Sequence, residues 1–240
     1  MYNLQLKTPF TSIISGGTGA GKTHLLYNIL RFRRALFDVP PQKVILFYAM
    51  KQDIYDSMLR TGAIDEMVQG IPDSTDLENM LTPYSSGAGC VIIFDDQMNN
   101  ITDDLQDIFT QIGHHQKCSV FFLSQNLFFR STKYRTMTLN THYLFVMKSV
   151  AATSQVITLA KHFSPYQTNY IIKGFQDATK SPYKYMLFDF HPSTPDHIRI
   201  RTNILPYEWP MWTYMQANAN IGRKRKRKQN NFSSKRSRFE

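Results

Sequence analysis

The chain has 240 residues, of which 42% are hydrophobic, a formal net charge of +10 and only two cysteines. This length and apolar content are enough for one substantial α/β core, and they exclude a chain that is disordered along its body. The first ten residues lack the basic and apolar regions of a signal peptide, and no apolar run approaches the roughly 18 residues of a membrane span, so we expect no membrane partner.

The positive charge is concentrated at the carboxyl end. Residues 223–240 hold nine of the 28 basic residues and one of the 18 acidic residues, which leaves residues 1–222 nearly neutral. We therefore predict a single domain over residues 1–222 and a basic tail over residues 223–240 that lacks an apolar period and is disordered. Cys90 and Cys118 each begin an apolar run, which favours two reduced thiols in the core.

The first predicted elements enclose a glycine-rich segment. Residues 10–15 are apolar enough for a buried strand, and the apolar residues from Leu25 to Leu36 repeat at helical spacing. Between them, residues 16–23 read GGTGAGKT and fit the Walker A pattern G-x-x-x-x-G-K-[ST] at every fixed position. The predicted nucleotide-binding residues are Gly16, Gly17, Thr18, Gly19, Ala20, Gly21, Lys22 and Thr23.

Each residue type in this segment suits a phosphate ligand. Glycines let backbone N–H groups approach a phosphate closely, and the N-terminus of the following helix attracts an anion. We expect Lys22 to bring its charge to the β- and γ-phosphates and the Thr23 hydroxyl to coordinate Mg²⁺. ATP and Mg²⁺ are therefore the predicted cofactors.

A strand with acids at its end follows. Residues 43–49 predict a second strand, residues 50–83 a connecting helical segment, and residues 90–96 a strand that ends in Asp95 and Asp96. A buried strand delivers such carboxylates to the carboxyl edge of an open sheet, where α/β proteins place their ligands. We expect Asp95 to hold Mg²⁺ and Asp96 to act on the attacking water; the alternative is that both merely begin the next loop.

A third apolar strand ends in an amide. After a helix expected over residues 101–112, the run at residues 117–126 places Ser124 and Gln125 at its end. An uncharged amide suits water orientation or contact with the γ-phosphate, the alternative being a cap of the next turn. The elements predicted after this strand are strands over residues 142–148, 185–190 and 197–203 and helices over residues 151–162 and 166–177.

The order of these elements predicts the fold class. Phosphate loop, acid-bearing strand and amide-tipped strand follow one another as in ATPases with an additional strand between the first two. We therefore predict an α/β fold, a RecA-like P-loop NTPase of the additional-strand type with a central mostly parallel sheet flanked by helices.

Over most of residues 9–206 the chain resembles the viral DNA-packaging ATPases of the FtsK/HerA superfamily, most closely those of Polinton (Maverick) elements and adintovirus-like viruses. The resemblance is carried by PFTSIISGGTGAGKT at residues 9–23, VIIFDD at residues 91–96 and HHQKCSVFFLSQNLF at residues 114–128. The later segments RTMTLNTHY at residues 135–143, DATKSPY at residues 177–183 and RIRTNI at residues 199–204 are similar to the same family.

The resemblance implies a ring-forming ATPase, pentameric or hexameric, that moves double-stranded viral DNA into a preformed capsid, with capsid vertex proteins as partners. It implies the roles already given to Lys22, Thr23, Asp95, Asp96 and Gln125. The superfamily usually has Asp-Glu where this chain has two aspartates, a shorter second acid that must approach closer or act through another water.

Many relatives also place an arginine just before the amide-tipped strand, where this chain has Gly113 and His114. Arg130 and Arg135, which lie just beyond Gln125 in the sequence, are our candidates for the cation that completes a neighbouring subunit's site, and the equal alternative is that both are solvated loop arginines. Lys133 and His114 are further candidates for this cation.

Two other functions compete with packaging. The first is a helicase or replication-associated ATPase of the same element, and the second is a nucleic-acid-binding or nuclear-transport adaptor that acts through its tail.

The basic tail has the composition of a nuclear import signal or a DNA-binding patch, the alternative being a solvated segment that only aids solubility. It predicts nuclear import receptors as partners and the host nucleus as the location, with the virion as a second location. The basic residues concerned are Arg223, Lys224, Arg225, Lys226, Arg227, Lys228, Lys235, Arg236 and Arg238.

Overall fold

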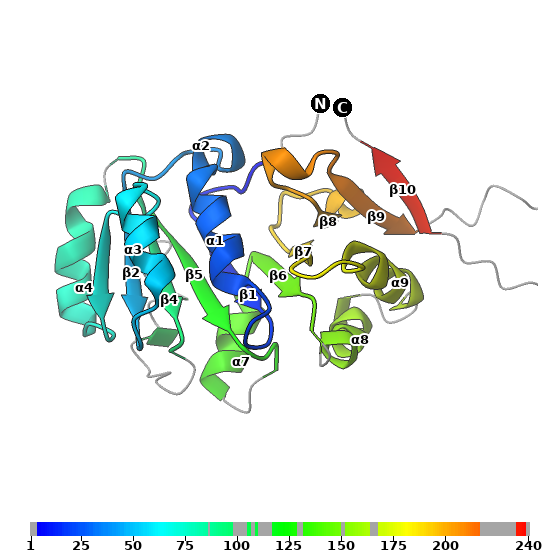
Figure 1. The fold of residues 1–240 in the computed structure, drawn as a ribbon, viewed down its shortest axis with the longest axis horizontal. Helices are drawn as coiled ribbons and strands as arrows, with labels where there is room; N and C mark the ends of the chain where they lie inside the picture. Colours follow the sequence, from blue (N-terminus) through cyan, green and yellow to red (C-terminus); the bar gives the residue numbers. More distant parts are fainter. Residues whose placement is uncertain are drawn as a thin grey trace, which may run out of the picture.

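A ten-stranded sheet runs through the whole described part of the chain (Figure 1). The computed structural model describes residues 4–85, 87–97, 105–106, 109, 117–128, 132–149, 152–163, 168–216 and 234–238. The strands are β1 Thr11–Ser15, β2 Lys43–Tyr48, β3 Glu66–Gln69, β4 Cys90–Asp95, β5 Cys118–Ser124, β6 Tyr143–Met147, β7 Tyr185–Asp189, β8 Ile200–Thr202, β9 Trp212–Gln216 and β10 Ser234–Arg238. Their order across the sheet is β10-β9-β8-β7-β6-β1-β5-β4-β2-β3.

The sheet has a parallel half and an antiparallel half. Strands β6, β1, β5, β4, β2 and β3 are parallel to one another, whereas β7, β8, β9 and β10 pair antiparallel. Strand β5 lies between β1 and β4, as the sequence order predicts. In register, Ser15 pairs with Ser124 and Phe94 with Phe122, so the carboxyl ends of these three strands meet at one edge.

Helices cover both faces of the sheet. They are α1 Lys22–Arg31, α2 Arg33–Leu36, α3 Asp53–Arg60, α4 Ser74–Leu81, α7 Thr132–Leu139, α8 Ala152–Phe163 and α9 Thr168–Ala178, with short 3₁₀ turns η1 Thr82–Tyr84, η4 Asp196–Ile198 and η5 Pro206–Glu208. Successive strand residues point to opposite faces. Ile14 therefore packs in one core with Leu26 of α1 and Met58 of α3, while Ile13 packs in the other core with Met137 of α7.

Three predictions made from the sequence differ from the structure. The segment around Met67 and Val68 reads as helical but forms the edge strand β3. Cys90 and Cys118, predicted as reduced thiols, are joined as a disulfide because their strands β4 and β5 are neighbours and place both residues in register. Within the tail, residues 234–238 form β10, since the edge of β9 offers backbone hydrogen bonds that need no apolar side chains.

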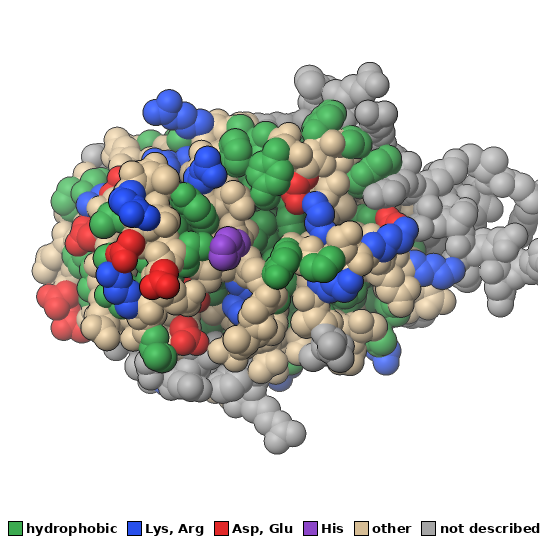
Figure 2. Space-filling model, viewed as in Figure 1, with side chains coloured by type: hydrophobic (Ala, Val, Ile, Leu, Met, Phe, Trp, Pro, Cys, Tyr) green, Lys and Arg blue, Asp and Glu red, His purple; other side chains and the backbone are tan. Residues whose placement is uncertain are grey.

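Charges on the described surface are mixed. Figure 2 shows lysine and arginine side chains interspersed with aspartate and glutamate over the face that carries α1 and α3. This distribution fits the nearly neutral body expected from the sequence. None of the helices in the described ranges is long and apolar enough to cross a membrane.

Candidate nucleotide-binding site

The segment between β1 and α1 forms a loop at the carboxyl edge of the sheet. The Gly16 N–H donates to the carbonyl of Ser124 at 3.0 Å, which ties the start of the loop to the end of β5. A Cβ atom on Gly16 would lie 2.6 Å from the Cβ of Met147, so β6 leaves no room for a side chain there. Gly21 caps α1 with a φ of 95°, in the left-handed region that favours glycine.

Lys22 occupies the interior of this loop. Its Nζ donates to the carbonyls of Gly16 at 2.8 Å and Gly17 at 3.3 Å. Burial lowers the pKa of the Lys22 ammonium, and the nearby carboxylates of Asp95 and Asp96 oppose that shift. The positive charge of Lys22 is thus held partly desolvated at the N-terminus of α1, the end of a helix that stabilises an anion.

Asp95 is the buried acid of the pair. It is 3% exposed, and its Oδ2 accepts hydrogen bonds from Thr23 Oγ1 at 3.1 Å and from the Tyr55 hydroxyl at 2.9 Å. Burial raises the pKa of Asp95, while the two hydroxyl donors and the charge of Lys22 counteract the rise. A threonine hydroxyl and a carboxylate this close are oxygen ligands of the kind Mg²⁺ prefers, so the residues present fit that ion.

Asp96 and Gln125 face each other across the ends of β4 and β5. The Gln125 Nε2 donates to Asp96 Oδ1 at 3.4 Å, and both side chains are exposed to the cavity described below. Asp96 has a φ of 59°, a conformation that costs a non-glycine residue energy and that clusters at functional positions. The backbone therefore turns sharply after Asp95, which separates the two adjacent carboxylates.

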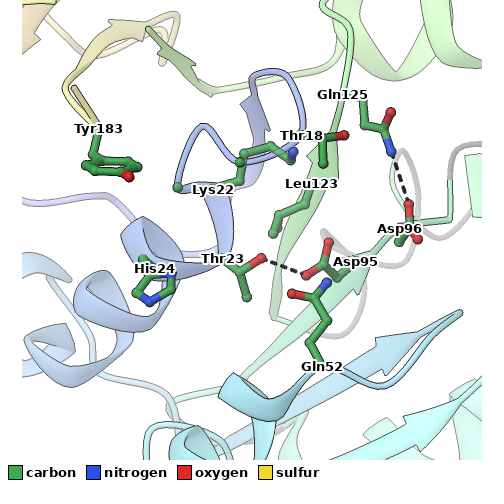
Figure 3. A pocket seen from close by; sticks show the side chains of 12 residues that line it. Thr18, Lys22, Thr23, His24, Gln52, Asp95, Asp96, Leu123, Gln125 and Tyr183 are labelled. Atoms are coloured by element: carbon green, nitrogen blue, oxygen red, sulfur yellow. Dashed lines mark hydrogen bonds between the residues drawn. The ribbon is translucent and has the colours of Figure 1, made fainter. Parts of the chain in front are cut away.

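These side chains converge on one cavity of about 710 Å³ (Figure 3). The cavity lies over the carboxyl ends of the central parallel strands, where open α/β sheets bind ligands. Its lining combines the loop, the acids and the amide expected from the sequence with several residues that the sequence did not indicate. The lining residues are Thr18, Gly19, Gly21, Lys22, Thr23, His24, Gln52, Asp95, Asp96, Leu123, Gln125 and Tyr183.

Of the two candidate arginines, only Arg135 lies among the described residues, and it does not line this cavity. Arg135 lies exposed on α7 and lines a different cavity, on the sheet face opposite α1. Arg130 and His114 lie outside the described residues, as do residues 223–228 of the tail and the helix predicted over residues 101–112 apart from residues 105, 106 and 109. Lys235, Arg236 and Arg238 belong to β10.

Sequence reasoning missed two residues that shape the site. Tyr55, fully buried on α3, reaches Asp95 from a helix whose pattern shows only an apolar face. Tyr183 follows Pro182 in the DATKSPY segment, which carried the family resemblance without an assigned role. Only the three-dimensional arrangement places Tyr55 against Asp95 and Tyr183 against the phosphate loop.

No protein-family model and no curated protein matches this sequence. Among solved structures, the chain is similar to the genome packaging NTPase B204 from Sulfolobus turreted icosahedral virus 2. The alignment with the sulfate complex of B204 has a TM-score of 0.50 at 11% sequence identity. It covers 82% of this chain and 97% of the B204 chain. The alignment with the complex of B204 and ATP-gammaS has a TM-score of 0.48 at 10% sequence identity and covers 81% of this chain and 96% of the B204 chain.

The cytoplasmic domain of the type VII secretion ATPase EccC from Thermomonospora curvata has a TM-score of 0.47 at 13% identity. It aligns with 77% of this chain, which corresponds to 24% of its own length. The likeness to the sulfate complex of B204 bears on the fold alone. Together with the sheet order, it confirms the predicted α/β fold of a RecA-like P-loop NTPase with an additional central strand.

Proposed function

We propose that this protein hydrolyses ATP and works as a ring-forming motor that translocates double-stranded viral DNA into a preformed capsid. The observation that carries the proposal is the convergence of Lys22, Thr23, Asp95, Asp96 and Gln125 on one cavity at the carboxyl edge of the sheet. A phosphate loop alone would support binding. The acid and amide on the adjacent strands add the groups that hydrolysis needs.

The chemistry follows from the position of each group. Water attacks the γ-phosphorus, the bond to the β–γ bridging oxygen breaks, and ADP and phosphate leave. Lys22 holds the phosphates, Asp96 accepts the proton of the attacking water, and Gln125 orients that water. Mg²⁺, which Thr23 and Asp95 would hold, supplies charge neutralisation on the phosphate oxygens when bound.

The proposed motor role has support from two directions. The sequence segments that resemble FtsK/HerA packaging ATPases extend beyond the phosphate loop, and the B204 neighbour is described as a genome packaging NTPase. Among the described residues no arginine lines the cavity, which fits a site completed by an adjacent subunit of a ring. We further propose an affiliation with Polinton or adintovirus-like elements, capsid vertex proteins and nuclear import receptors as partners, and the host nucleus as the location.

The test is steady-state ATP hydrolysis by the full chain with duplex DNA, with single-stranded DNA of equal length, and without DNA. Particle mass is measured by sedimentation in each condition. We expect duplex DNA to stimulate hydrolysis most. In its presence we expect the particle mass of a pentamer or hexamer. The matched control is Lys22→Ala, which removes the charge at the phosphates and should abolish hydrolysis. Stronger stimulation by single strands would favour the helicase alternative, and wild-type hydrolysis by Lys22→Ala would refute the site.

A further inference from the structure

The nucleotide cavity has two ends of different chemistry (Figure 3). Asp95 and Asp96 lie toward one end, Lys22 and Thr23 lie in the middle, and the ring of Tyr183 lies at the opposite end. The terminal phosphate of a bound nucleotide must lie near the acids, because hydrolysis occurs there. The rest of the nucleotide then extends from the middle toward Tyr183.

A second, smaller cavity begins at the Tyr183 end. Its volume is about 180 Å³, and it shares Gly21, His24 and Tyr183 with the nucleotide cavity. Asn28 of α1 and Tyr207 of η5 are among its other lining residues. Three tyrosines line this space together with an imidazole, an amide and the ion pair of Lys184 with Glu208. Flat apolar surfaces with a few polar groups are the usual composition of a small-molecule subsite.

Tyr183 is held in position although the residue is 69% exposed. Its φ of 61° is a left-handed conformation that costs a bulky residue energy. A Cβ atom on Gly21 would lie 3.1 Å from the Tyr183 Cδ1, so the ring packs directly on the phosphate loop. Of the four described non-glycine residues with positive φ, Asp96 and Tyr183 both line the nucleotide cavity, one at each end.

The segment after Tyr183 anchors this wall. The Lys184 carbonyl accepts the N–H of Lys148 at 2.9 Å, which fixes the chain to the end of β6. Glu208 accepts hydrogen bonds from the Lys184 ammonium at 2.9 Å and from the Tyr185 hydroxyl at 2.7 Å. These bonds tie η5, which carries Tyr207, to the strand that follows Tyr183, so the two walls of the small cavity form one unit.

We infer that Tyr183 and the small cavity form the subsite for the nucleobase, with the base stacked on the Tyr183 ring. The inference rests on the proposed nucleotide function and adds the residue that distinguishes a nucleotide from a bare polyphosphate. Base–aromatic stacking tolerates any planar base, so Tyr183 provides affinity. His24 and Asn28 are placed to contact the edge of the base.

The test is calorimetric titration of the full chain with Mg²⁺–ATP and, separately, with Mg²⁺–tripolyphosphate, which has phosphates but no base. We expect wild type to bind ATP more tightly than tripolyphosphate. Tyr183→Ala should weaken ATP binding by about fivefold or more and leave tripolyphosphate binding unchanged, since stacking on one ring contributes at least about that factor. Tyr183→Phe, which keeps the ring, is the matched control and should bind like wild type.

Tyr183→Gly is the second variant, because glycine suits the left-handed backbone and removes the ring without strain. Unchanged ATP affinity in both ring-deletion variants would overturn the inference. An equal loss for ATP and tripolyphosphate would also overturn it, since Tyr183 would then act only by shaping the phosphate loop. If wild type binds neither ligand, the proposed nucleotide function itself fails, a result distinct from either of the others.

Discussion

Asp95 and Asp96 are neighbours in sequence but occupy opposite environments. Asp95 is buried and accepts hydrogen bonds from Thr23 and Tyr55, whereas Asp96 is exposed to the cavity and its carboxylate accepts a hydrogen bond from Gln125. A buried carboxylate beside a hydroxyl suits a metal, and an accessible one suits proton transfer. The alternation of side chains along a strand predicts this division, whereas the positive φ of Asp96 has no sequence signal.

Asp96→Asn should retain ATP binding and lose turnover by about 10²- to 10⁴-fold, the usual contribution of a positioned base. The amide keeps the size and the contact distance to Gln125 but cannot accept the proton. ATP affinity by calorimetry and phosphate release under saturating ATP measure the two effects separately. An unchanged turnover number would assign the base to another residue.

Gln125→Ala should slow hydrolysis and remove its dependence on duplex DNA, because the amide contacts Asp96 and lines the same cavity as the phosphate loop. Phosphate release is measured with and without duplex DNA. Gln52→Ala is the comparison variant, since Gln52 lines the same cavity and has no role assigned to it. Full DNA stimulation in Gln125→Ala would show that its contact with Asp96 is only structural.

The elements that build the site come from the parallel half of the sheet, and this half is the more predictable from sequence. Strands β2, β4 and β5 are largely apolar runs because both of their faces are buried. Strand β3 is a four-residue edge strand with intermediate burial, so its composition carries no comparable signal. The disulfide between β4 and β5 was not predictable either, because neighbouring position in a sheet is a property of topology.

The contact between the phosphate loop and β6 predicts an effect on stability. Gly16→Ala should destabilise the protein by about 1–3 kcal/mol, the usual cost of forcing a methyl group into a packed position. The obstructing atom is the Cβ of Met147, so shortening that side chain to alanine would not relieve the clash. Gly17→Ala is the matched control, since its nearest neighbour is the Ser149 Cβ at an ordinary 3.8 Å. Chemical denaturation of both variants without nucleotide measures the difference, and equal stabilities would contradict the packing argument.

The assembly of subunits is the property that one chain shows least. Arg135 lies on α7, outside its own nucleotide cavity, and Arg130 lies outside the described residues. A cation that reaches a neighbour's site has to lie outside its own, and Arg135 meets this requirement. Proximity to Gln125 in the sequence is the only feature that indicates the two arginines, since no pattern of residue types marks a contact between subunits.

Mixing Asp96→Asn subunits with Arg135→Ala subunits should restore part of the ATPase activity that each lacks alone. At a mixed seam the Arg135→Ala chain supplies an intact Asp96 and the Asp96→Asn chain supplies an intact arginine. Activity is followed across mixing ratios, and Arg130→Ala is tested in the same way. Absence of rescue with either arginine variant would direct the search to Lys133 or His114.

We propose that DNA attraction and nuclear import reside in the basic tail and can be separated from catalysis. It holds nine basic residues, while the nucleotide cavity lies at the centre of the sheet, far along the strand order from β10. Deletion of residues 223–240 should leave basal hydrolysis intact, exclude a fluorescent fusion from the nucleus, and weaken DNA binding at low salt, because attraction to phosphates is charge-driven and salt-sensitive.

Deletion also removes β10 and exposes the edge of β9, so a second variant keeps the chain length and replaces only the six basic residues at positions 223–228 with glutamine. Nuclear fluorescence in transfected cells and DNA binding at two salt concentrations are compared for both variants. Loss of import in the substituted chain assigns import to the first basic cluster, and loss only on deletion assigns it to the segment that includes β10. Nuclear accumulation of both variants would refute the import proposal. The deletion removes residues 223–228 and also Lys235, Arg236 and Arg238, so no basic import signal remains in that variant's tail.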